Sequence, residues 1–433
     1  MISRRQLLAL GAVTVVVAAC SSDESTATTP TSPAPTDAAD ATTTTASPAT
    51  TVATTDPPAT DAPTTTAAPT TTISIEDLAN AYSEPGPYPI GVVTRMLAKG
   101  PSVEIWYPAV EGTTGTVSYD VRDFTPEGIR AILTADIPAS YSFEGARDAE
   151  SADGEFPVML FSHGFTGIRL QSTFLTSHLA SWGFIVAAPD HPSRDLSNVL
   201  LGTASGDRND AVDDLLKTLE LVIAEGDDAA GVLGGKVDAT QVVAIGHSAG
   251  GGTVLGAALD ERVGGYVSLA SGALLGGGGD AAAAGVTTTT LAPNLPDKPS
   301  FFIAGSVDGV VPPETVTRPA FEAAPRPSRL WIIDGVGHNG FDDFCTFGNG
   351  TGIIGIADAS GLSTLLDAQP QLRKLGEDGC KPPAVPVDET FPIIRHAVTA
   401  WVRALFGIDA SPVGLGTDMA DAYSQPVEIV ERL

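Results

Sequence analysis

The residue best placed to do chemistry is Ser248, in the segment 246–250, which reads Gly-His-Ser-Ala-Gly. An apolar, β-branched run at 241–245 precedes this segment, and a helical pattern of small residues follows it. A serine between a strand and a helix lies on a sharp turn, whose strained backbone pushes the hydroxyl away from the sheet. The pentapeptide also arises by chance in a chain with 46 glycines. The flanking strand and helix therefore favour a nucleophile over a glycine-rich turn.

Two further residues have the types and positions that would activate this serine. Asp308 follows an apolar run at 301–304, and His338 follows another at 329–333. Because the carboxyl ends of parallel strands meet at one edge of a sheet, we expect the three side chains to lie together. A histidine can take the serine proton and return it to the leaving group, while a carboxylate fixes the tautomer of its ring. The predicted chemistry is acyl transfer through a covalent acyl-enzyme.

Three other aspartates compete with Asp308 for the role of the acid. Asp334 lies four residues before His338, and Asp342 and Asp343 follow the histidine closely. We expect Asp334 to point its own way from the end of its strand, and Asp342 and Asp343 to be solvated. Asp308 is therefore the predicted acid.

Backbone N–H groups are expected to stabilise the negative charge that develops on the substrate carbonyl oxygen. One donor is predicted at Ala249, directly after the nucleophile and at a helix N-terminus. The second is predicted at Phe165, in the loop 162–167 that follows the strand 157–161. The ring of Phe165 would also form a wall of the acyl pocket, and His163 is expected to support the loop by hydrogen bonding. A plain glycine turn is the alternative for this loop.

The remaining histidines and motifs point to no second chemistry. We expect His178 and His396 to lie on helices, His247 to occupy the variable position of the turn, and His191 to be structural. No HExxH, CxxC or GxxxxGK[ST] sequence occurs, so we expect neither a metal nor another cofactor. A net charge of −29 argues against a nucleic-acid partner. We expect the protein to be a monomer.

Strands and helices alternate from Phe156 onward, as a parallel sheet covered on both faces requires. An antiparallel pair of strands precedes this part, and residues 109–155 have a mixed pattern with one helix that would line a substrate cleft. Two insertions interrupt the alternation, a flexible loop at 272–297 and a glycine-rich excursion at 344–385. The expected strands are 88–93, 102–108, 157–161, 184–188, 241–247, 265–270 and, as the last two, 300–305 and 329–333. The expected helices are 126–133, 170–181, 207–224, 249–259 and 389–406.

The N-terminal segment 1–20 is predicted to be an export signal. Residues 3–8 resemble a twin-arginine motif, and residues 17–20, Val-Ala-Ala-Cys, resemble a bacterial lipobox in which Cys20 is acylated. The apolar run between them is too short to span a bilayer comfortably. An ordinary secretory signal or a short anchor is the alternative. We therefore predict a protein exported to the bacterial cell envelope and bound to the membrane through lipidated Cys20.

Residues 21–72 are mostly Thr, Ala, Pro, Ser and Asp, and such a segment cannot bury enough apolar surface to fold. We predict a disordered tether there and a single catalytic domain over 73–433. If Cys20 is lipidated, Cys345 and Cys380 remain, and an oxidising compartment favours a disulfide between them. Closing a loop of about 35 residues would stabilise the fold by roughly 3–4 kcal/mol. A zinc site would need more ligands than this neighbourhood offers.

Four motifs together resemble the α/β-hydrolase group: residues 163–165 (His-Gly-Phe), 184–192, 246–251 and 337–338 (Gly-His). The chain order Ser, Asp, His is also the order of this group. Within it, the chain resembles platelet-activating-factor-acetylhydrolase-like and dienelactone-hydrolase-like enzymes, and bacterial cutinase-type polyester hydrolases. The resemblance implies an α/β-hydrolase fold, with a mostly parallel central sheet, helices on both faces and loop insertions. It also implies a serine carboxylic-ester hydrolase with the triad Ser248, Asp308 and His338 and oxyanion donors at Phe165 and Ala249.

Two departures from the polyester hydrolases count against a polymer substrate. The aromatic residue that clamps the polymer ring is absent from 269–273, and Ala249 stands where those enzymes tend to have methionine. A small-molecule or lipid ester is therefore the expected substrate. Two alternatives are an acyltransferase acting on envelope lipids with the same triad, and a non-catalytic surface lipoprotein that binds lipid. The presence of all three triad residues argues against the second alternative.

Overall fold

The computed structural model describes residues 74–433, with the exception of 99, 134 and 273–294. The predicted export signal, Cys20 and the tether lie outside the described residues, as does most of the expected loop at 272–297. In the ranges that are described, none of the helices is long and apolar enough to cross a bilayer.

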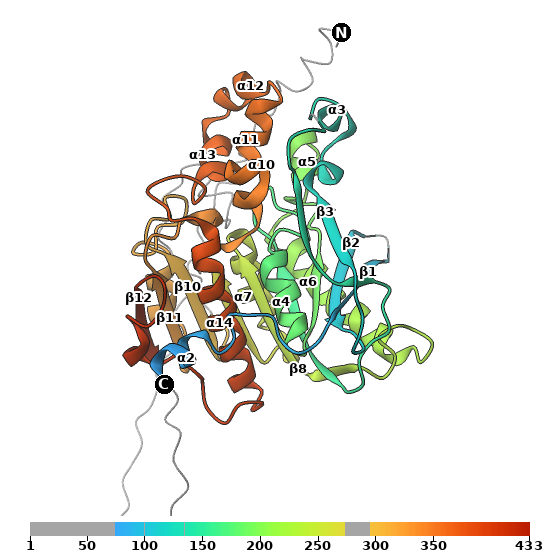
Figure 1. Ribbon diagram of the computed structural model, residues 1–433, viewed down its shortest axis with the longest axis vertical. Helices are drawn as coiled ribbons and strands as arrows, with labels where there is room; N and C mark the ends of the chain where they lie inside the picture. Colours follow the sequence, from blue (N-terminus) through green and yellow to red (C-terminus); the bar gives the residue numbers. More distant parts are fainter. Residues whose placement is uncertain (1–73, 99, 134, 273–294) are drawn as a thin grey trace, which may run out of the picture. The chain divides into compact units, whose positions relative to one another are not determined.

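A mixed sheet forms the centre of the fold (Figure 1). Among the described residues the ten strands lie in the order β12 (Val427–Arg432), β11 (Ser328–Ile333), β10 (Ser300–Gly305), β9 (Gly265–Leu269), β8 (Val237–His247), β6 (Phe156–Ser162), β7 (Ile185–Pro189), β2 (Ser102–Pro108), β1 (Ile90–Met96) and β5 (Ala146–Arg147). The six adjacent strands from β11 to β7 run parallel to one another, whereas β2 is antiparallel to β7, β1 is antiparallel to β2, and β12 is antiparallel to β11. The prediction of a mostly parallel sheet with an antiparallel start is confirmed.

Helices cover both faces of the sheet because the central strands are apolar on both sides. In β10, Phe301 and Ile303 belong to one hydrophobic core and Phe302 to the other, as the alternation of side chains along a strand requires. The first core contains side chains of α4 (Thr173–Ser181) and α14 (Val387–Leu405). The second contains side chains of α6 (Arg208–Asp227), α7 (Ala249–Ala257) and α9 (Thr317–Ala323).

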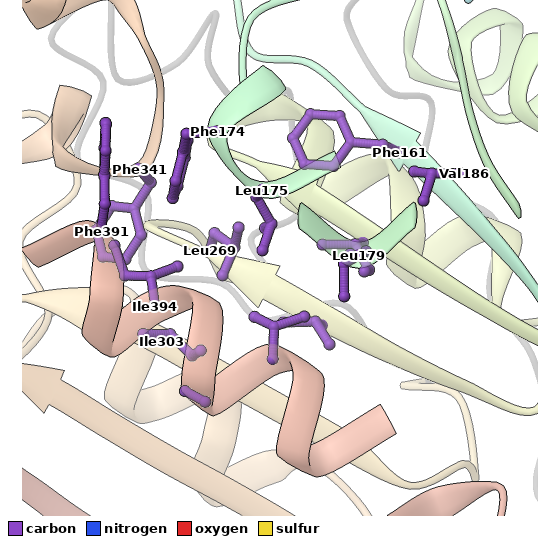
Figure 2. Packing of buried hydrophobic residues seen from close by; sticks show 14 of the residues in the cluster. Phe161, Phe174, Leu175, Leu179, Val186, Leu269, Ile303, Phe341, Phe391 and Ile394 are labelled. Atoms are coloured by element: carbon purple, nitrogen blue, oxygen red, sulfur yellow. The ribbon is translucent and has the colours of Figure 1, made fainter. Parts of the chain in front are cut away.

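The first core also holds the segment that carries His338. Figure 2 shows Phe174 of α4 against Phe391 of α14, with ring centroids 3.9 Å apart, and Leu269 of β9 beneath them. Phe341 is fully buried in the same cluster and ends the short 3-10 helix η2 (His338–Phe341). Packing of this phenyl ring therefore fixes the backbone of η2 relative to the sheet.

The sequence predicted that 329–333 is the last strand of the sheet, but one more strand follows it. The C-terminal segment β12 adds an antiparallel edge strand, with Val427 opposite Ile333. Its sequence, Val-Glu-Ile-Val-Glu-Arg, mixes three charged with three apolar side chains, which suits a partly exposed edge strand but resembles a polar tail.

Residues 109–155 contain more structure than the mixed pattern indicated. A two-stranded hairpin, β3 (Thr116–Asp120) with β4 (Ser140–Glu144), encloses a helix, α3 (Glu127–Arg130). This helix is shorter than the predicted 126–133, in keeping with Gly128 in its only turn and the absence of a side-chain cap. The sequence did not predict α5 (Leu196–Leu201). The other short elements are α2 (Ile75–Asn80), η1 (Val121–Phe124), η3 (Phe344–Thr346) and η4 (Thr417–Met419).

The segment 344–385 was expected to be a glycine-rich excursion, but it is largely helical. It contains α10 (Phe347–Gly350), α11 (Gly352–Ala359), α12 (Ser363–Asp367) and α13 (Pro370–Glu377). Gly352 begins α11 and Gly361 follows it, with φ values of 72° and 81°, a region that glycine enters without steric cost. These glycines therefore separate the short helices instead of preventing them.

Candidate active site

Ser248 lies on the sharp turn between β8 and α7. Its φ of 57° and ψ of −120° form a conformation that is strained for any residue with a Cβ atom. A Cβ added to Gly246 would lie 2.3 Å from the carbonyl oxygen of Gly250, and one on Gly250 would lie 1.9 Å from that of Ser162. Neither position accepts a larger residue. The strained turn that the sequence predicted is therefore present.

Two hydrogen bonds connect Ser248 to Asp308 through His338. The Nε2 atom of His338 lies 2.9 Å from Oγ of Ser248, and its Nδ1 atom lies 2.9 Å from Oδ2 of Asp308. The other carboxylate oxygen, Oδ1, accepts the backbone N–H groups of Val310 and Val311 at 2.8 and 2.7 Å. The structure thus brings together the three residues that the sequence singled out. In this geometry the imidazole can accept the serine proton while the carboxylate stabilises its charged form.

The electrostatic balance at His338 favours a strong base. Burial lowers the pKa of this imidazole, but the negative charges of Asp308 and Asp378, with the hydrogen bond that the ring donates to Asp308, outweigh that effect. The pKa of His338 is therefore raised above its ordinary value of 6.5.

The rival aspartates have other partners. Asp334 is exposed and accepts a hydrogen bond from Oγ of Ser306 at 2.9 Å. Asp342 and Asp343 are both 1% exposed, so the expectation that they are solvated is wrong. Asp342 accepts the backbone N–H of Phe344, and Asp343 accepts the backbone N–H of Phe174. Burial raises the pKa of both carboxyl groups well above the usual range.

The predicted oxyanion donors are positioned on two elements that meet at Ser248. Phe165 and Ser248 line the same small pocket, and Ala249 is the first residue of α7. Within the described ranges, neither the Phe165 nor the Ala249 backbone N–H donates to a protein acceptor. The neighbouring N–H of Gly164 is engaged, because it donates to Oε1 of Gln171 at 3.0 Å. Both predicted donors thus stay available to a carbonyl oxygen, and their role stays a prediction.

The topology decides the fold. The strands lie in the order β1-β2-β7-β6-β8-β9-β10-β11 with β2 antiparallel to its neighbours, and the strained serine follows the central strand β8. Residues 148–295 match the family model of the chlorophyllases. The chain has the α/β-hydrolase fold.

The other comparisons add little to this assignment. The chlorophyllase match covers about a third of this α/β-hydrolase, including Phe165 and Ser248, and ends before Asp308. No curated protein matches the chain. Among solved structures, a ferulic acid esterase from Streptomyces cinnamoneus is 19% identical, with a TM-score of 0.48 over 78% of this chain and 91% of that one. Together, the family match and the fold support an ester hydrolase in the broad sense.

In this α/β-hydrolase, His247 does more than fill the variable position of the turn. Its Nε2 atom lies 3.0 Å from the carbonyl oxygen of His338, and its Nδ1 atom lies 2.5 Å from Nε2 of Gln171. Burial lowers the pKa of His247 well below the ordinary value, so the ring is neutral and donates from Nε2. Gln171 and His247 therefore link the loop of Phe165 to the backbone of His338.

The other buried histidines have the structural roles that the sequence indicated. Nδ1 of His163 lies 2.8 Å from the carbonyl oxygen of Gly164, and its Nε2 accepts the backbone N–H of His191 at 3.0 Å. His191 in turn lies 2.9 Å from Oγ of Ser162. In the part of the chain that the structure describes, no three side chains of His, Cys, Asp or Glu cluster so that they could hold a metal ion.

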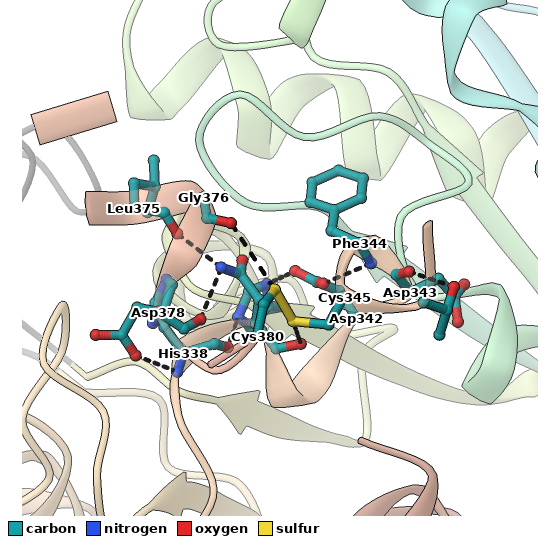
Figure 3. Close-up of a disulfide and its surroundings, with 12 residues drawn as sticks. His338, Asp342, Asp343, Phe344, Cys345, Leu375, Gly376, Asp378 and Cys380 are labelled. Atoms are coloured by element: carbon teal, nitrogen blue, oxygen red, sulfur yellow. Dashed lines mark hydrogen bonds and ion pairs between the residues drawn. A yellow bond between two sulfur atoms is a disulfide. The ribbon is translucent and has the colours of Figure 1, made fainter. Parts of the chain in front are cut away.

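Asp378 is a position that the sequence did not reveal. Its Oδ1 atom accepts the backbone N–H of His338 at 2.8 Å (Figure 3), and its Oδ2 atom accepts that of Gly309 at 3.0 Å. One carboxylate thus ties the loop of the base to the loop of the acid. The predicted disulfide between Cys345 and Cys380 is present, and its second cysteine lies two residues after Asp378. The cysteine spacing was the only sequence signal near this residue.

The raised pKa of His338 sets the expected pH dependence of this α/β-hydrolase. Only the neutral imidazole can accept the serine proton, so kcat/KM should fall as the pH drops through the pKa of His338. We expect the midpoint of this acid limb to lie above 6.5. A pH–rate profile with p-nitrophenyl acetate measures it, and a midpoint below the ordinary value would contradict the balance of charges described above.

Asp378→Asn is expected to move that limb to lower pH. The substitution removes a negative charge that favours the imidazolium form of His338, and one of the two backbone contacts weakens. We also expect kcat to fall between about ten- and a hundredfold with little change in KM, because the acid and base loops lose their common restraint. Asp334→Asn, at an exposed carboxylate, is the matched control and should leave the profile unchanged. An unshifted limb in Asp378→Asn would show that its charge does not act on the base.

Proposed function

We propose that the protein is a serine hydrolase of esterase or lipase type that cleaves a carboxylic ester through an acyl-enzyme. The observation that carries this proposal is the pair of hydrogen bonds from Ser248 through His338 to Asp308, on a strained turn beside two available N–H donors. The motifs that resemble platelet-activating-factor-acetylhydrolase-like enzymes favour a small-molecule or lipid ester over a polymer.

The proposed reaction has two halves. Oγ of Ser248 attacks the ester carbonyl carbon while Nε2 of His338 takes the hydroxyl proton, and the N–H groups of Phe165 and Ala249 stabilise the oxyanion. The tetrahedral intermediate collapses as His338 returns the proton to the departing alcohol, which leaves the acyl group on the serine. Water then attacks the acyl-enzyme with His338 as general base, and the carboxylic acid leaves with the serine hydroxyl restored.

Reaction with an active-site probe tests the proposal directly. The purified protein should be labelled by a fluorophosphonate. It should also hydrolyse p-nitrophenyl acetate with a burst of nitrophenol, because we expect deacylation of the covalent intermediate to be slower than acylation. Mass spectrometry of the labelled peptide should place the phosphonate on Ser248. If the protein is neither labelled nor active on any p-nitrophenyl ester, it is not a serine hydrolase.

We further propose that the protein is exported and held at the membrane of the bacterial cell envelope by lipidated Cys20. The lipobox-like sequence 17–20 and the tether-like composition of 21–72 support this proposal. We expect Cys20→Ser to move the protein from the membrane fraction to the soluble fraction, because the acyl chains can no longer be attached. Ser21→Ala, at the adjacent position, should leave the protein with the membrane. Membrane retention of Cys20→Ser would contradict lipidation.

A further inference from the structure

An apolar cleft of about 130 Å³ lies between two groups of elements outside the sheet. One wall is formed by η1, α3 and α5, and the other by α11, α12 and α13, and Figure 1 shows these groups facing each other beyond one end of the sheet. Ile129 and Leu200 are typical of the first wall, and Ile354 and Leu366 of the second. Within the described ranges, no aromatic and no charged side chain lines this cleft.

The cleft adjoins the small pocket at Ser248. Thr166, Ile353 and Gly376 line both the cleft and the small pocket that contains Ser248 and His338. Thr166 directly follows Phe165, the predicted oxyanion donor. A chain bound in the cleft would therefore lie close to an ester carbonyl held at Ser248.

We propose that this cleft binds an aliphatic chain of the ester, an inference that rests on the hydrolase function proposed above. The lining offers no ring for aromatic stacking and no charged group for a polar headgroup, whereas a hydrocarbon chain gains from leaving water. Each methylene that enters the cleft is expected to raise kcat/KM roughly fourfold until the cleft is full. The substrate class is therefore an ester of a long aliphatic acid or of a long aliphatic alcohol.

Two series of substrates distinguish these two sources of the chain. Nitrophenyl esters of increasing acyl length extend the acid side, and acetates of increasing alkyl length extend the alcohol side. We expect kcat/KM to rise with chain length in one series only, and that series identifies the side of the ester that occupies the cleft. Equal rates at all lengths in both series would overturn the inference.

A pair of substitutions on α11 links the chain-length effect to the cleft. Ala357 lines the cleft, so Ala357→Phe should fill part of it and lower kcat/KM for the longest substrates at least tenfold relative to kcat/KM for the acetate ester. Ala359 is exposed on the same helix, and Ala359→Phe is the matched control that should retain the chain-length preference. If Ala357→Phe retains the preference as well, the chain binds elsewhere. If Ala357→Phe does not fold, Leu366→Ser replaces it and should lower the slope with chain length.

Failure of the inference and failure of the proposed function give different results. Hydrolysis of p-nitrophenyl acetate without any dependence on chain length contradicts only the cleft assignment. No hydrolysis of any ester contradicts the proposed function, and calorimetry then tests the cleft independently of turnover. Methyl decanoate and decyl acetate should bind Ser248→Ala more tightly than ethyl acetate does, and Ala357→Phe in the same background should remove this difference. Equal binding of all three esters would show that the cleft does not hold an aliphatic chain.

Discussion

Ser248→Ala is expected to lower kcat for p-nitrophenyl acetate by about 10⁵- to 10⁶-fold and to abolish fluorophosphonate labelling. The imidazole of His338 hydrogen-bonds to this one hydroxyl, at 2.9 Å, and alanine leaves the base with nothing to deprotonate except water. The residual rate should come from the oxyanion donors and from binding alone. Steady-state kinetics measures the loss of kcat, with the concentration of each variant taken from total protein.

The folded state should be almost unaffected by this substitution. Alanine keeps the Cβ atom, so the strained φ of 57° and its cost persist, and the melting temperature should stay close to that of the unmodified protein. Ser306→Ala is a matched control, because Ser306 also follows a strand of the sheet but bonds to exposed Asp334. If Ser248→Ala keeps more than a small fraction of its activity, another nucleophile carries the reaction.

The parts of the site that could be predicted from the sequence are those whose constraints are local. The turn at Ser248 requires glycine at 246 and 250 because backbone atoms crowd those positions, and that requirement leaves a readable spacing. Strands such as β10 are apolar on both faces and therefore form continuous hydrophobic runs. Asp308 and His338 each follow such a run, and the parallel arrangement of these strands brings them to one edge of the sheet.

The parts that the sequence did not reveal depend on distant contacts. Asp343 resembles a solvated residue until the fold places the N–H group of Phe174, 169 residues away, against it. Asp342 accepts the nearby N–H of Phe344, but its burial still depends on the packing of the whole fold. Asp378 has no motif of its own, because its two backbone partners come from loops 40 and 69 residues away in the chain.

The aliphatic cleft illustrates the same limit. Its walls are short helices from separate insertions, such as α3 and α11, which have four and eight residues. Helices of this length are marginal in water by themselves, so their stability comes from packing that local propensity does not report. The sequence predicted the helix at 126–133 that contributes to one wall, but it treated 344–385, which forms the other wall, as a glycine-rich excursion.

The second large effect is expected at the acid, where Asp308→Asn should lower kcat by about 10⁴-fold. The backbone N–H groups of Val310 and Val311 both point at Oδ1 of this carboxylate and require an oxygen there. An asparagine must therefore direct its amide nitrogen toward Nδ1 of His338. That nitrogen donates a proton, so the ring is forced into the tautomer that carries its hydrogen on Nε2 and cannot accept the proton of Ser248.

Asp334→Asn distinguishes this explanation from a general effect of removing charge near the histidine. Asp334 is closer to His338 in the sequence, but its carboxylate is exposed and bonds to Ser306, so kcat should change by less than about twofold. Steady-state kinetics on both variants with the same ester compares the two. A larger loss of kcat at Asp334 than at Asp308 would reassign the acid. Equal, small losses would mean that the imidazole takes its working tautomer without a carboxylate, since no other acidic side chain in the described ranges hydrogen-bonds to Nδ1 of the ring.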